Sequence, residues 1–255
     1  MSDAVLVEVA GGIATVTLNR PEVRNAIDRP TAVAIAAALD EADARDDVSV
    51  IVLTGAGSTF CAGMDLKAFS ATKERPIDDV RGAFGIAERP PAKPIIAAIE
   101  GKALGGGLEI ALACDLVVAA EDSMLGLPEV KRGLVAAAGG VLRLPRRVPY
   151  GIAMEMVLTG EPMAAAQARE WGLVNRVAPS GAALETAREL AAAVAANAPL
   201  AIRAAKRIVV ESADWSAEEE FVRQRVHTDP VRSSADAAEG ARAFVEKRDP
   251  VWSGS

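Results

Sequence analysis

Short apolar runs divide the chain into alternating strand and helix segments. Near the N-terminus, residues 5–9 and 13–18 alternate or run apolar around Gly11-Gly12, a pattern that predicts a β-hairpin. The pattern of apolar residues predicts helices over residues 31–44 and 108–113. Further apolar runs have the length of buried strands, at residues 50–54, 95–99, 116–119 and 174–177. A strand, turn, helix order therefore repeats through the first half of the chain.

Beyond Gly133 the pattern is almost entirely helical, apart from the strand candidate at 174–177. Alanine is abundant in two segments, and this composition favours helix over low-complexity disorder: residues 182–196 and 201–205. From about Pro199 onward, amphipathic helices are expected at 218–226 and 235–245. These helices predict a subdomain or a contact between subunits.

A glycine-rich turn precedes the helix expected at 108–113. Gly105-Gly106-Gly107 lies between a strand and that helix, and Glu109 follows Gly106 by three positions, over the same helix end. Helix starts carry unpaired NH groups, and glycine lets a ligand approach the backbone, so the turn suits an oxyanion hole beside an acid or base. Taken alone, the segment also fits a closely packed turn whose glutamate complements the helix dipole.

Composition narrows the classes of function. The chain of 255 residues has a net charge of -7 and 4% aromatic residues, so a basic nucleic-acid-binding surface is not expected. Cys61 and Cys114 have no metal-ligand spacing and are expected in the core, and a zinc site is improbable with His227 as the single histidine. His227 is expected at the surface. No apolar run approaches membrane-spanning length and the first 12 residues lack a leader pattern, so we expect a cytoplasmic protein.

Several common enzyme motifs are absent. Gly55-Ala56-Gly57 follows a strand, but Phe60 stands where a dinucleotide fingerprint needs its third glycine. Neither a Walker loop nor the Gly-x-Ser-x-Gly elbow of α/β hydrolases occurs. We therefore expect neither a dinucleotide site of the Gly-x-Gly-x-x-Gly type, nor a nucleotide-hydrolysing P-loop, nor an α/β-hydrolase active site.

Motifs spread over nearly the whole length resemble the enoyl-CoA hydratase/isomerase (crotonase) superfamily. They are, in the order of that family, residues 18–26, 60–67, 101–109, 127–129, 139–140, 158–160 and 172–175. Within the family, three segments are similar to carnitinyl-CoA dehydratase, at residues 139–145, 171–177 and 246–252. The resemblance implies an α/β fold, a spiral of β-β-α turns with two roughly perpendicular sheets. It also implies a core over residues 1–198 and a helical trimerisation region over 199–255, in a homotrimer or a dimer of trimers.

The same resemblance implies a chemistry. The backbone NH groups of Met64 and Gly106 match the oxyanion hole that holds a CoA-thioester carbonyl, and Glu109 and Glu129 match the two carboxylates of hydratases. Glu109 would mainly activate a water, and Glu129 would deliver a proton to the α-carbon. No metal and no separate cofactor are implied, because coenzyme A is part of the substrate. Glu129 alone would also fit an ordinary first-turn residue after Pro128.

Further positions match the part of the family site that binds the substrate. They are Arg24, Ala26, Ala62, Asp65, Leu66, Ala137, Phe244 and Lys247, of which the last two match positions that reach the nucleotide of a neighbouring subunit. Solvated surface charge is an equal alternative for Arg24 and Lys247. The cluster Arg143, Arg146 and Arg147 is expected to be solvated or at an interface. One departure is that Ala136-Ala137-Ala138 replaces the Pro-Gly pair of many hydratases before Gly139-Gly140.

We therefore expect an enoyl-CoA hydratase, which reversibly adds water to a trans-2-enoyl-CoA. The nearest alternative is carnitinyl-CoA dehydration, followed by isomerase or CoA hydrolase reactions of the same superfamily. An alternative of another class is a non-catalytic oligomer that binds acyl-CoA. The acyl chain and the pathway do not follow from the sequence.

Overall fold

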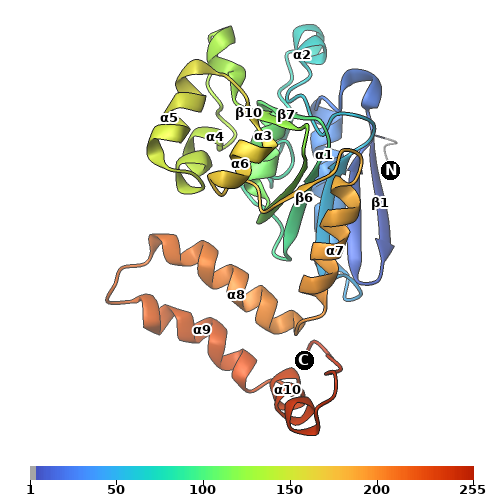
Figure 1. The fold of residues 1–255 in the computed structure, drawn as a ribbon, viewed down its shortest axis with the longest axis vertical. Coiled ribbons are helices and arrows are strands. Elements are labelled where there is room, and N and C mark those ends of the chain that lie inside the picture. Colours follow the sequence, from blue (N-terminus) through green and yellow to red (C-terminus); the bar gives the residue numbers. More distant parts are fainter. Residues whose placement is uncertain (1–3) are drawn as a thin grey trace.

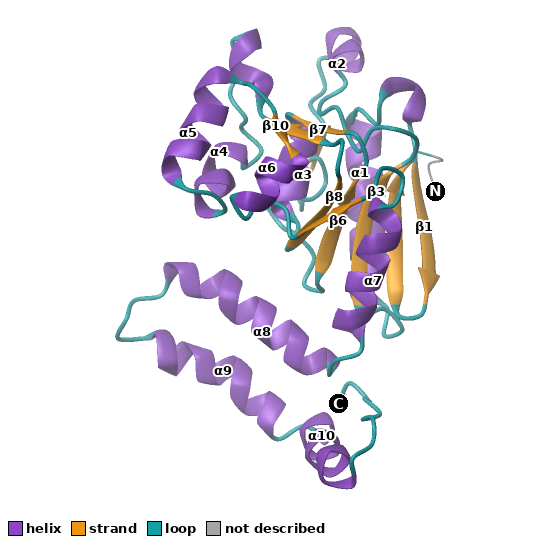
Figure 2. Ribbon diagram, in the orientation of Figure 1, coloured by secondary structure: helices purple, strands orange, loops and turns teal. Residues whose placement is uncertain are grey.

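The computed structural model describes residues 4–255 and has a six-stranded sheet at its centre, in the order β1-β2-β3-β6-β8-β11 (Figures 1 and 2). Its strands are β1 (Val5–Ala10), β2 (Ile13–Leu18), β3 (Val50–Gly55), β6 (Ile95–Ile99), β8 (Leu116–Ala120) and β11 (Arg176–Ala178). The first two form the expected antiparallel hairpin, and all other neighbours are parallel. Parallel strands are usually buried on both faces, which explains the continuous apolar runs of β3 and β6. Residues 1–3 of the predicted core lie outside the described residues.

Two smaller sheets complete the strands. The three-stranded sheet has the order β10-β9-β7, with β7 (Lys102–Leu104), β9 (Met124–Gly126) and β10 (Met163–Ala164). The two-stranded sheet pairs β4 (Ile77–Asp78) with β5 (Gly82–Ala83). Each of β7 and β9 directly follows a strand of the large sheet, so the chain alternates between sheets before each return. This arrangement confirms the predicted α/β fold class.

Helices connect many of the strands and form the C-terminal part of the chain. They are α1 (Arg29–Ala44), α2 (Leu66–Thr72), α3 (Gly106–Ala113), α4 (Gly140–Arg143), α5 (Tyr150–Thr159), α6 (Ala165–Glu170), α7 (Ala183–Ala195), α8 (Pro199–Glu211), α9 (Glu220–Arg232) and α10 (Ala235–Glu246). Short 3-10 turns are η1 (Pro21–Val23), η2 (Pro128–Arg132), η3 (Leu144–Arg146) and η4 (Ser212–Asp214). Asp28 caps α1, because its carboxylate accepts a hydrogen bond from the Thr31 NH at 2.9 Å.

The large sheet is covered on both faces. Alternate residues of a strand point to opposite sides, so Val50 and Val52 pack with Ala187 of α7, whereas Ile51 and Leu53 belong to the main core with Leu39 of α1. Figure 1 shows α7 lying across one face of the sheet and α1 across the other. The small alanine side chains let α7 lie close to the strands, which explains its alanine-rich sequence.

The last three helices extend away from the sheets (Figure 1, orange to red). Helix α8 is attached to the core through Lys206, whose Nζ donates to the carbonyl oxygens of Pro91 and Lys93 at 2.8 Å and lies 2.7 Å from Asp115 Oδ2. The division into residues 1–198 and 199–255 stays a prediction.

The structure differs from the sequence predictions in a few places. The strand expected at 174–177 is observed at Arg176–Ala178, because the Val174 NH instead donates to the Ala168 carbonyl. The side chain of His227 is only 13% exposed, less than expected, since its ring stacks on Trp215 and bonds Glu211. Cys61 and Cys114 are buried in the core, as expected.

Gly107 provides a test of how α3 packs on the rest of the core. A Cβ added at Gly107 would lie 2.1 Å from the backbone oxygen of Cys61, which accepts a hydrogen bond from the Leu104 NH at 3.1 Å. We expect Gly107→Ala to lower the free energy of unfolding by about 1–3 kcal/mol, measured by thermal or denaturant unfolding. Gly151→Ala in α5 is the matched control, because a Cβ there meets nothing within 4 Å. Equal stability of the two variants would contradict this packing.

Candidate active site

Two backbone segments approach each other closely at the start of α3. The segment 61–64 runs beside β7, where the Cys61 NH donates to the Lys102 carbonyl and the Leu104 NH donates to the Cys61 carbonyl, both at 3.1 Å. Gly63 has a φ of +91°, and a Cβ on it would lie 3.0 Å from the Gly106 nitrogen. Glycine at this position therefore permits the approach both conformationally and sterically.

Each segment offers one unpaired NH at this point. On either side of Met64, the Ala62 NH donates to the Arg24 carbonyl and the Asp65 NH donates to the Ile27 carbonyl. Within residues 4–255, the NH groups of Met64 and Gly106 have no hydrogen-bond acceptor. The Gly106 NH is unpaired because it belongs to the first turn of a helix, where the helix dipole also favours negative charge. The structure thus brings together the two predicted oxyanion-hole donors.

Phe84 packs against the start of α3. Its ring occupies the space where Gly106 lacks a side chain, since a Cβ on Gly106 would lie 2.2 Å from Phe84 Cζ. Phe84 itself is 6% exposed and has a left-handed φ of 57°. A bulky residue rarely adopts that conformation, so the surrounding turn must impose it. Sequence reasoning missed Phe84, and no local motif identifies it.

The two predicted carboxylates both lie near this helix start. Glu109 is 3% exposed, and its Oε1 accepts hydrogen bonds from the NH groups of Ala138 at 2.7 Å and Gly140 at 2.9 Å. Glu129 lies in η2, with its Oε1 only 3.2 Å from the position that a Cβ on Gly105 would occupy. Its Oε2 is buried and has no hydrogen-bond partner among residues 4–255. One carboxylate is therefore anchored, and the other has an oxygen free for a ligand.

Both carboxyl groups have raised pKa values. Burial is the main cause of the raised pKa of Glu109, and the nearby Glu129 charge adds to it, while the NH groups of Gly140 and Ala138 oppose it. Burial also raises the pKa of Glu129. Each group consequently holds its proton to a higher pH than an ordinary glutamate does, which suits an acid/base pair.

Most of the predicted binding residues lie on two segments next to Met64. Arg24 and Ala62 are joined by a backbone hydrogen bond of 3.1 Å, and the buried Ala26 accepts from Arg20 Nη1 at 2.6 Å. Asp65 caps α2 by accepting from the Ala68 NH at 3.0 Å, and exposed Leu66 begins that helix. Of these residues, Arg24, Ala62 and Leu66 are exposed close to the Met64 NH in the chain.

The remaining predicted residues divide between two places. Ala137 is exposed and lies directly beside Ala138, whose NH binds Glu109. Phe244, 85% exposed, and Lys247 lie at the end of α10, far from α2 along the long axis of the molecule (Figure 1). A single chain does not bring Phe244 and Lys247 to the site.

Two arginines that were expected in solvent or at an interface, Arg143 and Arg147, form hydrogen bonds within the chain. Arg143 is half-buried and donates to the Ala87 carbonyl at 2.6 Å, and Arg147 donates to the Asp115 carbonyl at 3.2 Å. These two residues are therefore not simply solvated, whereas Arg146 is exposed, and the interface alternative stays a prediction. Arg20, which lies 3.1 Å from Asp65 and 3.2 Å from Asp28, was also missed. The sequence signal that could have identified Arg20 is its position within the family motif at residues 18–26.

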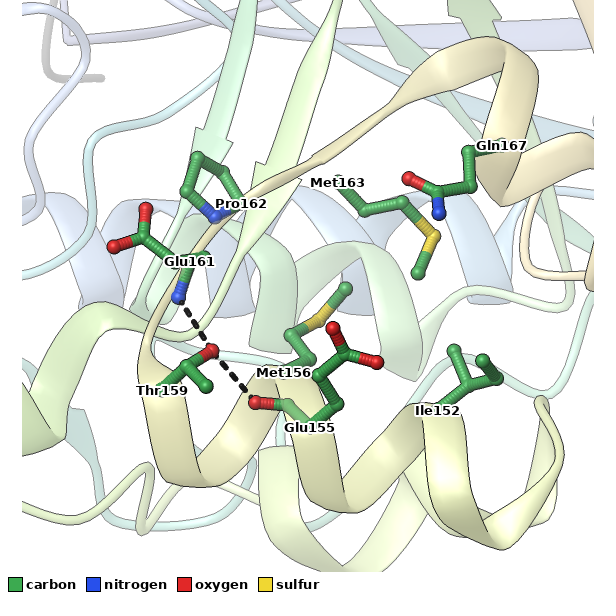
Figure 3. A pocket seen from close by; sticks show the side chains of 8 residues that line it. All are labelled: Ile152, Glu155, Met156, Thr159, Glu161, Pro162, Met163 and Gln167. Atoms are coloured by element: carbon green, nitrogen blue, oxygen red, sulfur yellow. Dashed lines mark hydrogen bonds between the residues drawn. The ribbon is translucent and has the colours of Figure 1, made fainter.

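A separate hollow lies between α5 and β10 (Figure 3). Its volume is about 130 Å³, and it is lined by Ile152, Glu155, Met156, Thr159, Glu161, Pro162, Met163 and Gln167. Thr159 Oγ1 donates to the Glu155 carbonyl at 2.7 Å and accepts from the Glu161 NH at 3.1 Å (Figure 3). None of the predicted site residues lines this hollow, so the carboxylate pair remains the candidate site.

The part of the chain that the structure describes contains no group of three or more His, Cys, Asp and Glu side chains placed to hold a metal ion. No helix within residues 4–255 is long and apolar enough to cross a membrane. The cytoplasmic location stays a prediction.

Comparison with known proteins identifies the family. Residues 8–255 match the enoyl-CoA hydratase/isomerase family. The chain belongs to this family. The predicted family, the α/β fold class and the assignment as an enzyme of the hydratase type are thereby confirmed, while the roles of individual residues stay predictions.

Several relatives of known structure or name cover the whole chain. Enoyl-CoA hydratases from Mycobacterium marinum and Mycobacterium tuberculosis H37Rv are each 52% identical, with a TM-score of 0.97 and full coverage of both chains. A carnitinyl-CoA hydratase structure from Mycobacterium avium is 44% identical, with a TM-score of 0.80 and full coverage of both chains. The carnitinyl-CoA dehydratase of Salmonella heidelberg (strain SL476) is 44% identical over 263 residues, again with full coverage of both. The enoyl-CoA hydratase/isomerase fold of this chain is therefore matched over its entire length.

The raised pKa of Glu109 predicts a stability gain when its charge is removed. A folded-state pKa above the unfolded value means that stability falls as the pH rises through it, because ionisation is harder in the folded protein. Glu109→Gln keeps an oxygen that can accept from Ala138 and Gly140 but cannot ionise. We expect its Tm to exceed that of the wild type by a few degrees above the raised pKa, since about 1 kcal/mol shifts Tm by roughly 2–4 °C at this size.

The measurement is thermal unfolding from pH 4 to pH 9, about the range in which buried carboxyl groups titrate. At the acidic end the difference between wild type and Glu109→Gln should vanish. Glu189→Gln, at an exposed position of α7, is the control and should leave Tm unchanged throughout. A constant difference at every pH would contradict the link to Glu109 ionisation.

Proposed function

We propose that the protein is a hydro-lyase that adds water to a trans-2-enoyl-CoA to form a 3-hydroxyacyl-CoA, and catalyses the reverse dehydration. The observation that supports this most directly is the placement of the buried Glu109 and the half-buried Glu129, both with raised pKa values, near two unpaired backbone NH groups. A thioester needs the NH pair, and water addition across a double bond needs both an acid and a base.

In this proposal the thioester oxygen binds between the NH groups of Met64 and Gly106. As the water oxygen attacks the β-carbon, electrons move through the conjugated system and negative charge collects on that oxygen as an enolate. The donors are already oriented by the segment 61–64 and the first turn of α3, so they need not reorganise during the reaction. Each such donor contributes roughly 3–4 kcal/mol to transition-state stabilisation.

The carboxyl groups complete the reaction. Glu109 in its ionised form takes a proton from the attacking water, and Glu129 in its protonated form gives a proton to the α-carbon of the enolate. The hydroxyl thus adds to the β-carbon and the hydrogen to the α-carbon, and dehydration uses the same groups in reversed roles. The Ala138 and Gly140 NH groups hold Glu109 Oε1, which orients its other oxygen for the water.

Coenzyme A would bind along the segments next to Met64. We assign backbone contacts with adenine and pantetheine to Ala26, Ala62, Asp65 and Leu66, and a phosphate contact to Arg24. Ala137 lies beside the loop that holds Glu109, where its backbone can help bind the water. The position of Phe244 and Lys247 at the far end of the chain fits contacts with the nucleotide bound to a neighbouring copy.

A second candidate reaction is the dehydration of carnitinyl-CoA. The relatives from Salmonella heidelberg and Mycobacterium avium that are 44% identical carry carnitinyl-CoA names, whereas those at 52% are named enoyl-CoA hydratases. The two substrates share the thioester and the double bond but differ in a quaternary ammonium group on the acyl chain. Aromatic faces and carboxylates recognise such a cation, so the choice depends on the acyl side of the site.

Self-association as a trimer or a dimer of trimers is also proposed. Helices α9 and α10 expose large apolar side chains, including Phe221 at 63%, Val226 at 69% and Val245 at 80%. An apolar surface of this kind on an extended helical arm is favourable when another protein surface covers it. The helices project away from the sheets, where another copy can reach them (Figure 1).

The catalytic proposal predicts turnover that depends on both carboxyl groups. Purified protein should remove the 2-enoyl-thioester absorbance of crotonyl-CoA, of a longer enoyl-CoA, or of crotonobetainyl-CoA, and relative kcat/KM ranks the substrates. Glu109→Gln and Glu129→Gln should each lower kcat by at least about 100-fold, because each removes a proton-transfer group. Glu189→Gln, exposed on α7, should retain full activity.

The binding of a CoA thioester by Glu109→Gln and Glu129→Gln is measured alongside by calorimetry. Affinity within a few-fold of wild type would show that the variants lose chemistry and keep the site. Wild-type protein that binds these thioesters without converting any of them would contradict the hydratase proposal and favour a non-catalytic acyl-CoA-binding oligomer.

The proposed assembly predicts a solution mass of three or six times the 26.4 kDa chain, measured by size-exclusion chromatography with light scattering. Phe221→Glu places a charge on the apolar face of α9 and should shift the mass towards the monomer. Val80→Glu, at a 57% exposed position outside the helical arm, should leave it unchanged. A monomeric wild type would contradict the assembly.

A further inference from the structure

One half-buried arginine connects the two sides of the candidate active site. On one side lies the turn that carries Phe84, whose ring packs on Gly106. On the other side lies the loop whose Ala138 and Gly140 NH groups hold Glu109. Arg143 belongs to α4, which follows that loop, and its side chain reaches the first side.

Arg143 contacts both its own loop and the turn that follows Phe84. Its backbone NH donates to the Gly139 carbonyl at 2.8 Å, and its side chain folds back over the same glycine. Gly139 has a φ of +97°, a backbone conformation that favours glycine, and a Cβ there would lie 2.1 Å from Arg143 Nη1, so the guanidinium lies over this glycine. The other arm, Nη2, donates to the Ala87 carbonyl at 2.6 Å. Arg143 therefore spans from its own loop to the turn behind Phe84.

Arg143 interacts electrostatically with Glu109. Glu109 is acted on by two charged neighbours, Glu129 and Arg143, and the arginine favours its ionised form. Arg143 in turn faces Glu109, Cys114, Arg146 and Arg147. An arginine stays protonated throughout the pH range of a folded protein, even when it is partly buried. The site thus contains a permanent positive charge close to the proposed base.

We propose that Arg143 is a positioning residue, which clamps the loop 138–140 against the turn at 84–87 and keeps a positive charge near Glu109. The inference rests on the proposed hydratase function for its kinetic consequence. Arg143 touches neither the water nor the thioester in this account, and it acts through Glu109. Lysine could supply the charge but not the planar fork that packs on Gly139 and reaches Ala87 at once.

The test compares Arg143→Gln, Arg143→Lys and the control Arg146→Gln, which removes an exposed arginine of the same segment. With crotonyl-CoA, Arg143→Gln should lower kcat by about 10–100-fold, since a small displacement of the base costs that much, and leave KM within a few-fold. The acidic limb of its kcat-pH profile should move to higher pH, because the favouring charge is lost. Arg143→Lys should keep the limb in place with an intermediate kcat, and Arg146→Gln should match the wild type.

A second readout does not depend on turnover. Infrared difference spectra between each protein and its Glu109→Gln counterpart follow the Glu109 carboxyl band as the pH is raised. Its midpoint should lie at higher pH in Arg143→Gln than in wild type or Arg146→Gln. An inactive wild type would refute the proposed function, whereas an unmoved Glu109 midpoint in folded Arg143→Gln would refute the role of Arg143. Equal losses in the Gln and Lys variants, with no shift of the midpoint, would refute it as well.

Discussion

The close backbone approach between the segment 61–64 and the first turn of α3 is the constraint on which the site depends. Side chains are excluded there: a Cβ on Gly63 would press on the Gly106 nitrogen, and one on Gly107 would overlap the Cys61 oxygen. Strand β7 fixes the register through its hydrogen bonds with Cys61. As a result, the two NH groups that lack partners in residues 4–255 lie on neighbouring segments, as the proposed oxyanion hole requires.

The carboxyl groups are placed around the same point by different elements. Glu109 comes from α3 itself and is held by a loop that precedes α4, whereas Glu129 comes from the 3-10 turn after β9. Burial raises the pKa of both, which costs stability once they ionise and provides groups able to exchange protons. The anchoring NH groups and Arg143 act in the opposite direction on Glu109, so its ionisation is set by a balance of opposing effects.

The parts of the structure that follow from the sequence are those governed by local patterns. Short continuous apolar runs predicted β3 and β6, and the glycine-rich turn predicted the start of α3, because periodicity and backbone freedom act over a few residues. Strands β7, β9 and β10 have two or three residues each, too few to show a period. Phe84 and Arg143 depend on contacts between segments far apart in the chain, so no local signal marks their roles. The residues that match the family motifs were found only through that resemblance.

The most direct test of the account is the infrared carbonyl stretch of a 13C-labelled enoyl-CoA thioester bound to Glu109→Gln, in which turnover is blocked. Two backbone donors from Met64 and Gly106 should polarise the carbonyl and lower its stretching frequency below the value for the same thioester in water. A bound thioester whose carbonyl frequency equals or exceeds the value in water would contradict the proposed oxyanion hole.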